Sequence, residues 1–172
     1  GGGGGADLGW GVAGGGRGFG VAGGGGGLGV LVQGAGVGVG GESTCGTGVA
    51  GIAVHEEYLA SEDGSKTHLC AYVPAAAVSA PVGTVFIQTP YNVEGLQIKA
   101  LMFASAGVAV VTEDMEGRFD STGTWDLWRN TPRNSATTAA WIRSQAWSNG
   151  RIGVTGVSAN ACGAYLSRLG DP

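Results

Sequence analysis

The chain has 172 residues, which suits one domain and is too short for two of ordinary size. Its net charge of −4 argues against a surface that binds nucleic acid, and no run of about 18 apolar residues is present that could span a membrane. Glycine is very unevenly distributed, because 23 of the 37 glycines fall within residues 1–41. We therefore expect a glycine-rich low-complexity tail at residues 1–41 and a folded domain at residues 42–172.

The tail offers almost nothing to bury, since glycine has no side chain and loses the most backbone entropy on folding. We expect it to be disordered. Residues 36–41 and 46–51 both match the Gly-Xaa-Gly-Xaa-Xaa-Gly pattern of a dinucleotide-binding loop. No helix-forming stretch follows either match, so we interpret both as chance matches and expect no cofactor.

The three cysteines, Cys45, Cys70 and Cys162, are an odd and widely spaced set. This pattern argues against a disulfide framework and against a zinc site, so no metal is expected. No basic stretch precedes an apolar one, and therefore no signal peptide is indicated. Because the first residue is not Met, the start resembles that of a fragment or a processed chain, and the sequence assigns no compartment.

The folded part begins with two predicted strands, residues 52–59 and 66–73, joined by the strong turn signal Asp63-Gly64. Three short apolar runs predict further strands that are buried on both faces, at residues 84–88, 108–112 and 151–155. Helices are predicted at residues 94–106, 134–145 and 159–169. Strands that alternate with helices predict an α/β fold, in which the three buried strands are neighbours in one parallel sheet and the first two helices are crossovers.

The last predicted strand leads into Gly156-Val157-Ser158, and a helix of small residues follows. A serine on a sharp turn between a strand and a helix exposes its hydroxyl, and the crowded turn needs small neighbours two positions away. Gly156 meets this requirement fully and Asn160 less well. The alternative is an ordinary turn serine, but the order strand, turn, helix favours a nucleophile.

Several blocks of sequence together resemble the Xaa-Pro dipeptidyl-peptidase and cocaine-esterase group of serine hydrolases. The blocks are residues 88–92, 113–123 and 140–153, together with Asp63-Gly64. The most specific block is Trp-Ser-Asn-Gly-Arg-Ile-Gly at residues 147–153, just before the serine turn. The resemblance extends over about residues 52–170. It implies the first part of an α/β-hydrolase sheet and cleavage of a small peptide, ester or amide substrate, while the number of subunits stays open.

The resemblance also assigns roles to individual residues. Ser158 would be the nucleophile that is acylated. Tyr91 would donate its phenolic hydrogen to the oxyanion, and the backbone N–H of Ala159 would be the second donor. An oxyanion hole in this fold draws on the residue after the nucleophile and on a loop after an earlier strand, which agrees with both positions.

The sequence departs from the family pattern at several positions. In the turn that carries the nucleophile, Ala159 and Ala161 stand where the family has Tyr and Gly. The family loop Asp-Xaa-Arg-Gly appears as residues 114–117, with Glu116 in the place of the arginine and an arginine displaced to Arg118. This inverts a charge near the site, and Asp114 is expected to orient the loop and not to take part in catalysis.

The sequence does not supply an evident general base. In this fold the acid and the histidine follow the nucleophile along the chain, yet no histidine follows Ser158. His55 and His68 precede it and are interpreted as surface histidines of the hairpin. We therefore expect a chain truncated before the acid and the histidine, inactive by itself. Two alternatives remain open: an inactive fragment or pseudo-enzyme that serves as an interaction module, and a glycine-rich structural protein.

Overall fold

A computed structural model of the chain describes residues 20–23, 28–31 and 43–170. Its centre is a five-stranded sheet in the order β3-β4-β6-β5-β7. The strands are β3 (Ile52–Ala60), β4 (Lys66–Pro74), β5 (Val82–Thr89), β6 (Ala109–Asp114) and β7 (Ser148–Val154). β3, β4 and β6 pair antiparallel in turn, whereas β6-β5 and β5-β7 are parallel. The prediction that the three apolar runs are neighbouring parallel strands is therefore confirmed. The prediction that all three are buried on both faces is wrong for β7, which lies at the edge of the sheet and whose residues are half-buried or exposed.

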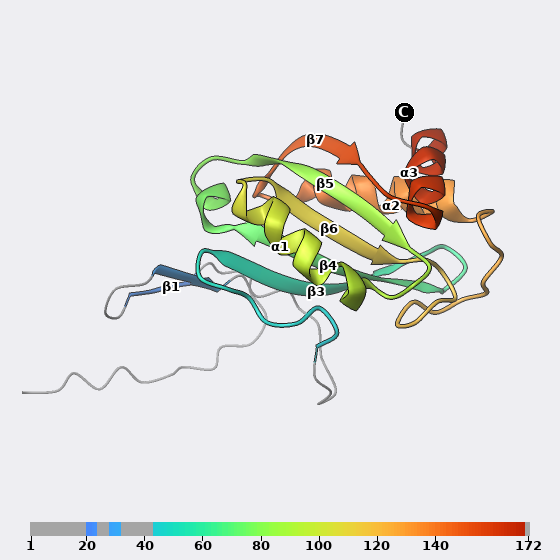
Figure 1. Cartoon of the computed structure of the whole chain (residues 1–172), viewed down its shortest axis with the longest axis horizontal. Coiled ribbons are helices and arrows are strands. Elements are labelled where there is room, and N and C mark those ends of the chain that lie inside the picture. Colours follow the sequence, from blue (N-terminus) through green and yellow to red (C-terminus); the bar gives the residue numbers. More distant parts are fainter. Residues whose placement is uncertain (1–19, 24–27, 32–42, 171–172) are drawn as a thin grey trace, which may run out of the picture.

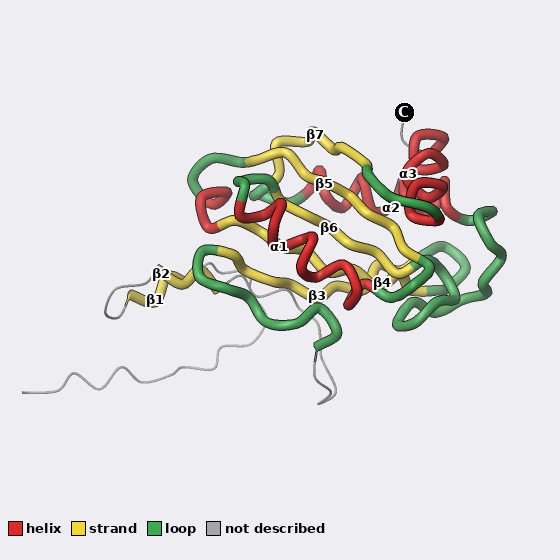
Figure 2. The backbone as a smooth tube through the Cα atoms, viewed as in Figure 1, coloured by secondary structure: helices red, strands yellow, loops and turns green. Residues whose placement is uncertain are grey.

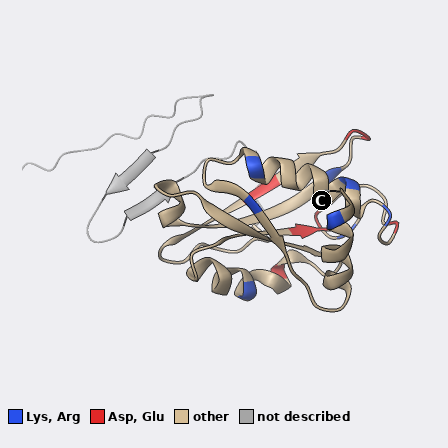
Figure 3. Cartoon of the chain, turned by 90° about the horizontal axis from the view of Figure 1, so that it is seen from above, with Lys and Arg blue, Asp and Glu red and all other residues tan. Residues whose placement is uncertain are grey.

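Helices cover both faces of this sheet (Figures 1 and 3). They are α1 (Gln97–Ser105), α2 (Thr131–Ser144) and α3 (Ala159–Gly170), with short 3-10 helices at Ala75–Val78 and Val93–Leu96. Two apolar cores result, one on each face: Ala100 and Ala104 of α1 belong to the first, and Ile142 of α2 to the second. No helix in residues 43–170 has the length and apolar character needed to cross a membrane.

The local sequence accounts for most element boundaries. The turn between β3 and β4 contains Gly64 at a φ of +84°, and both the N–H and the hydroxyl of Ser65 donate to Asp63 Oδ1. Helix α2 begins three residues earlier than predicted, at Thr131. Pro132 lies in its first turn, where a missing N–H costs no helical hydrogen bond.

The structure describes only two pieces of the glycine tract. β1 (Gly20–Gly23) and β2 (Leu28–Leu31) form a two-stranded antiparallel sheet (Figure 2). The glycine content had not predicted this pairing. The rest of the predicted disordered tail lies outside the described residues.

The prediction that the cysteines form no disulfide is wrong. Cys45 and Cys70 are bonded, with their Cα atoms 5.3 Å apart, and both residues are fully buried. The two positions are separated by 25 residues, and the bond joins the segment before β3 to β4. Spacing along the chain could not reveal a pairing that arises only when the hairpin folds back on itself. Cys162 is free and exposed.

Candidate active site

The backbone around Ser158 has the form that an exposed nucleophile requires. Ser158 lies between β7 and α3 with a φ of +56°, a conformation that residues other than glycine rarely adopt. A Cβ placed on Gly156 would overlap with the carbonyl carbon and oxygen of Asn160, so only glycine fits there. Strained turns of this kind concentrate at functional sites. The strand, turn and helix predicted around Ser158 are all present, and its side chain is exposed.

We expect Gly156→Ala to lower the free energy of unfolding by about 1–3 kcal/mol, because the added methyl group must displace the backbone of α3. The control is Gly153→Ala in β7, where the nearest atom to an added Cβ is 4.0 Å away. Urea denaturation of both variants measures the difference. Equal stabilities would show that the turn relaxes without cost.

The residues after Ser158 form the first turn of α3. Ala159 is the first residue of the helix, so its N–H is one of the groups without a partner within the helix. The N–H groups of Ala161 and Cys162 both donate to the carbonyl of Ser158. The Asn and Ala found here in place of the usual residues are therefore compatible with the turn.

Tyr91 lies in the loop after β5, and the residue is 63% exposed. β5 and β7 are parallel neighbours, and their ladder ends with Thr155 N–H donating to Phe86 O. Both the loop with Tyr91 and the turn with Ser158 therefore leave the sheet at the same edge. The structure brings these two predicted residues to one side of the domain.

The loop that carries Tyr91 is held from several directions. Tyr91 N–H donates to Thr89 Oγ1, and Arg118 Nε donates to the carbonyl of Pro90, each at 3.0 Å. Asp114 Oδ1 accepts from Val93 N–H at 3.0 Å. Arg118, displaced from its family position in the loop after β6, thus contacts the Tyr91 loop directly.

Asp114 has the structural surroundings that the sequence analysis expected. It is fully buried, and its Oδ2 lies 2.9 Å from His68 Nδ1 while its Oδ1 holds Val93. The carboxylate therefore connects β4, β6 and the loop after β5.

The inverted charge at Glu116 is compensated locally. Glu116 is almost fully buried, and Arg133 Nη2 lies 2.7 Å from its Oε2. Two amide groups of neighbouring residues, Asn130 and Asn134, also donate to it at 3.0 and 2.9 Å. All three partners belong to α2 or to the residue before it, so the beginning of α2 supplies the partners that the acid needs.

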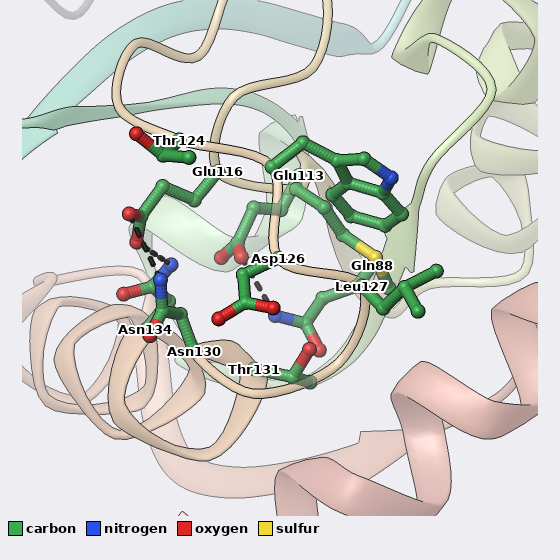
Figure 4. Close-up of a pocket in the computed structure, with 11 residues that line it drawn as sticks. Gln88, Glu113, Glu116, Thr124, Asp126, Leu127, Asn130, Thr131 and Asn134 are labelled. Carbon is green, nitrogen blue, oxygen red and sulfur yellow. Dashed lines mark hydrogen bonds between the residues drawn. The ribbon is translucent and has the colours of Figure 1, made fainter.

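Sequence reasoning missed Glu113, which contributes to a small pocket at the end of β6 (Figure 4). Glu113 is fully buried, accepts from Gln88 Nε2 at 2.7 Å and accepts from Thr138 Oγ1 at 2.5 Å. Burial raises the pKa of this carboxyl group to about 7. The signal that could have revealed Glu113 was its place in the sequence, since this acidic residue comes directly after a run predicted to be a buried strand.

The interpretation of His68 as a surface residue is wrong. His68 is fully buried, and its two ring nitrogens each lie 2.9 Å from a carboxylate, Glu56 Oε1 and Asp114 Oδ2. Burial acts to lower the pKa of His68, but the two carboxylates outweigh it and raise the pKa above its usual value. The sequence of β4 places apolar residues on one face of the strand, and it did not reveal that the face with His68 is also buried. His55 on β3 is half-buried.

Neither histidine is positioned to activate Ser158. β6 and β5 lie between β4 and β7, and strands about 4.8 Å apart place β4 roughly 14 Å from β7. β3, which carries His55, is one strand further away. The structure therefore brings together the turn with Ser158 and the loop with Tyr91. It does not bring a histidine base to them.

The fold is that of known hydrolases. An aminopeptidase from the marine sediment archaeon Thaumarchaeota archaeon has a TM-score of 0.59 and 18% identity over 67% of this chain. The corresponding values are 0.61, 19% and 75% for an α-amino acid ester hydrolase, and 0.57, 18% and 70% for a CocE/NonD family hydrolase from Staphylococcus aureus. The chain spans only 23% to 26% of the length of these three proteins.

The sequence itself matches a family. No match was found among the curated proteins. A family model for X-Pro dipeptidyl-peptidase, the S15 family, matches residues 63–168, which is more than half of the chain. This range includes the Tyr91 loop, the loop after β6 and the turn with Ser158. The chain therefore belongs to the X-Pro dipeptidyl-peptidase (S15) family of α/β-hydrolases.

Proposed function

We propose that this chain is the nucleophile-bearing part of a serine hydrolase that cleaves a small peptide, ester or amide through an acyl-enzyme on Ser158. The observation that carries the proposal is the positive φ of Ser158 together with the close approach of Asn160 to Gly156. A serine in a surface turn has no need of such a strained backbone. A nucleophile does, because the turn lifts its hydroxyl clear of the sheet.

The charge that develops during acylation also has candidate partners. The hydroxyl of Ser158 would attack the substrate carbonyl, and the oxygen of that carbonyl would become an oxyanion. The N–H of Ala159 at the start of α3 and the phenol of Tyr91 would donate hydrogen bonds to it. Preorganised donors of this kind are a major source of rate enhancement in acyl transfer, and no cofactor is needed for this chemistry.

The general base is proposed to come from residues beyond this sequence. The chain spans about a quarter of the length of the three hydrolases compared above, and His55 and His68 lie on strands away from β7. In the α/β-hydrolase fold, the acid and the histidine follow the nucleophile along the chain. Residues 1–172 alone would then carry a nucleophile that no base activates.

A fluorophosphonate probe tests this proposal, because it reacts only with a serine that is activated by a base. We expect no labelling of residues 1–172. A protein extended by the sequence that follows in its gene should be labelled, and Ser158→Ala should abolish the label. The control is Ser144→Ala, an exposed serine at the end of α2.

The other outcomes distinguish the alternatives. Labelling of the short chain would mean that His55 or His68 reaches Ser158, contrary to the order of the strands. Absence of labelling in the extended protein would contradict the hydrolase proposal and favour a catalytically inactive interaction module. The first residues to compare would then be Asn160, Ala161 and Glu116.

A further inference from the structure

Four side chains of the kinds that bind zinc converge at β3 and β4, away from the turn with Ser158. His68 and Cys70 are two positions apart on β4, so their side chains project from the same face of the sheet. Glu56 of β3 is paired directly with Cys70 and shares that face. Cys45, in the segment before β3, is bonded to Cys70 there.

The spacing of the donor atoms suits a single small ion. His68 Nε2 lies 3.8 Å from Cys45 Sγ and 2.9 Å from Glu56 Oε1. The donor atoms of Cys45, His68 and Cys70 all lie within 4.8 Å of one another, and the three residues are fully buried. Ligands of a tetrahedral zinc ion are roughly 3.3–3.8 Å apart, given Zn–N and Zn–S distances of about 2.0 and 2.3 Å. Once the bond between Cys45 and Cys70 is broken, its two sulfur atoms must separate to reach this spacing, and the Glu56 carboxylate, which lies outside that group of three, must turn toward them.

A second, independent feature points in the same direction. The other ring nitrogen of His68, Nδ1, lies 2.9 Å from Oδ2 of the fully buried Asp114. A histidine that binds a metal through one nitrogen almost always donates its other N–H to a carboxylate or a carbonyl group. Asp114 thus orients the ring so that Nε2 faces Cys45 Sγ and Glu56 Oε1.

We propose that the chain binds one Zn²⁺ through Cys45 Sγ, Cys70 Sγ, His68 Nε2 and Glu56 Oε1 when the disulfide is reduced. The disulfide and the zinc site are alternative states of the same two cysteines. A dithiol supplies two electrons and two protons by exchange and becomes a disulfide itself, and zinc then displaces the two thiol protons. The Glu56 side chain is 28% exposed, which leaves a path for the ion.

The two states would have different consequences for the domain. In each of them the segment that contains Cys45 is fixed to β4, either by a covalent bond or by the shared ion. Asp114 also holds Val93 N–H, so the proposed zinc site and the loop with Tyr91 share one carboxylate. The sequence argument against zinc considered only cysteines close together in the chain, whereas the proposed ligands come from three segments.

Titration with Co²⁺ tests the proposal, because cobalt replaces zinc and is coloured. The full chain is reduced with dithiothreitol, separated from it without air, and titrated. We expect one Co²⁺ per chain, with thiolate-to-cobalt charge-transfer bands that disappear when Zn²⁺ is added. The oxidised chain should show none of these bands. X-ray absorption of the zinc form should show two sulfur atoms at about 2.3 Å and two lighter ligands at about 2.0 Å.

Variants separate this site from incidental binding. Cys70→Ser should abolish the saturable charge-transfer signal, and Cys162→Ser, which removes the free exposed thiol, should leave stoichiometry and affinity unchanged. Asp114→Asn keeps all four ligands and should weaken binding by about 10–100-fold. Glu56→Gln, at a partly exposed position, should weaken binding while the charge-transfer bands remain.

Several results would overturn the proposal. They are the absence of saturable Co²⁺ binding by the reduced chain, a third sulfur in the metal shell, wild-type binding by Cys70→Ser, or wild-type affinity in Glu56→Gln. If reduction unfolds the chain, Zn²⁺ must restore its far-ultraviolet circular dichroism, because metal binding and folding are then coupled. Failure to restore it would also count against the site.

Discussion

Tyr91→Phe is expected, under the mechanism proposed above, to lower the turnover of the extended protein by about 100- to 1,000-fold, the typical cost of losing one oxyanion donor. The substitution removes one hydroxyl group and almost no volume. Because Tyr91 is 63% exposed, the free energy of unfolding should hardly change. KM should change much less than kcat, since the hydrogen bond strengthens only as the negative charge develops.

Steady-state kinetics with an ester substrate measure this effect, with Tyr58→Phe as the control. Tyr58 is also partly exposed, but it lies on β3, three strands from β5 in the sheet. Near-normal turnover of Tyr91→Phe would remove Tyr91 from the mechanism while leaving the role of Ser158 open. Loss of labelling in Ser158→Ala and loss of turnover in Tyr91→Phe therefore test different parts of the proposal.

The elements that the sequence predicted correctly are those that short stretches of chain determine. Val110 and Val111 lie in a continuous apolar run, and such a run has few solutions other than a strand buried on both faces. The turn at Ser158 was predictable for the same reason. A glycine two residues before a serine, between a strand and a helix, reflects a steric requirement within a few residues, and the contact between Gly156 and Asn160 shows it.

The features that the sequence did not reveal depend on contacts between distant segments. His68 is buried because Asp114 and Glu56, 46 and 12 residues away, provide partners for both ring nitrogens. The register of β3 against β4 decides that Glu56 faces Cys70, and this register follows from the completed sheet. Neither composition nor spacing contains that information.

The charge inversion at Glu116 was predictable from the sequence only in part. The sequence revealed an acid where the family has an arginine, but not its consequence. Arg133 on α2 lies 17 residues further along and supplies the opposite charge, and Asn134 adds an amide donor. The partners became visible only when α2 was placed beside the loop after β6.

Glu113→Gln should make the domain more stable at pH 8 by about 3 kcal/mol and change its stability by less than about 1 kcal/mol at pH 5. The pKa of Glu113 is about 7 in the folded chain, because burial penalises the charged form, and 4.5 is its ordinary value. Between these two values the folded state keeps a proton that the unfolded state has lost. Stability from this group is therefore present at low pH and falls as the pH rises through 7.

The neutral amide introduced by Glu113→Gln would resemble the protonated acid. Its oxygen can still accept from Gln88, and its NH₂ group can donate to the hydroxyl of Thr138, so both partners of Glu113 keep a hydrogen bond. The matched control is Glu116→Gln at the same pocket. It breaks the ion pair with Arg133 and should destabilise the domain at pH 8.

Urea denaturation at pH 5 and pH 8 compares these variants with the wild type. The pKa of His68 is also raised in the folded chain, but His68 is common to both proteins, so its contribution cancels in the difference. The difference in free energy of unfolding between the wild type and Glu113→Gln could instead be the same at pH 5 and pH 8. Glu113 would then be already ionised in the folded chain, and solvent would have to reach the carboxylate through the pocket at the end of β6.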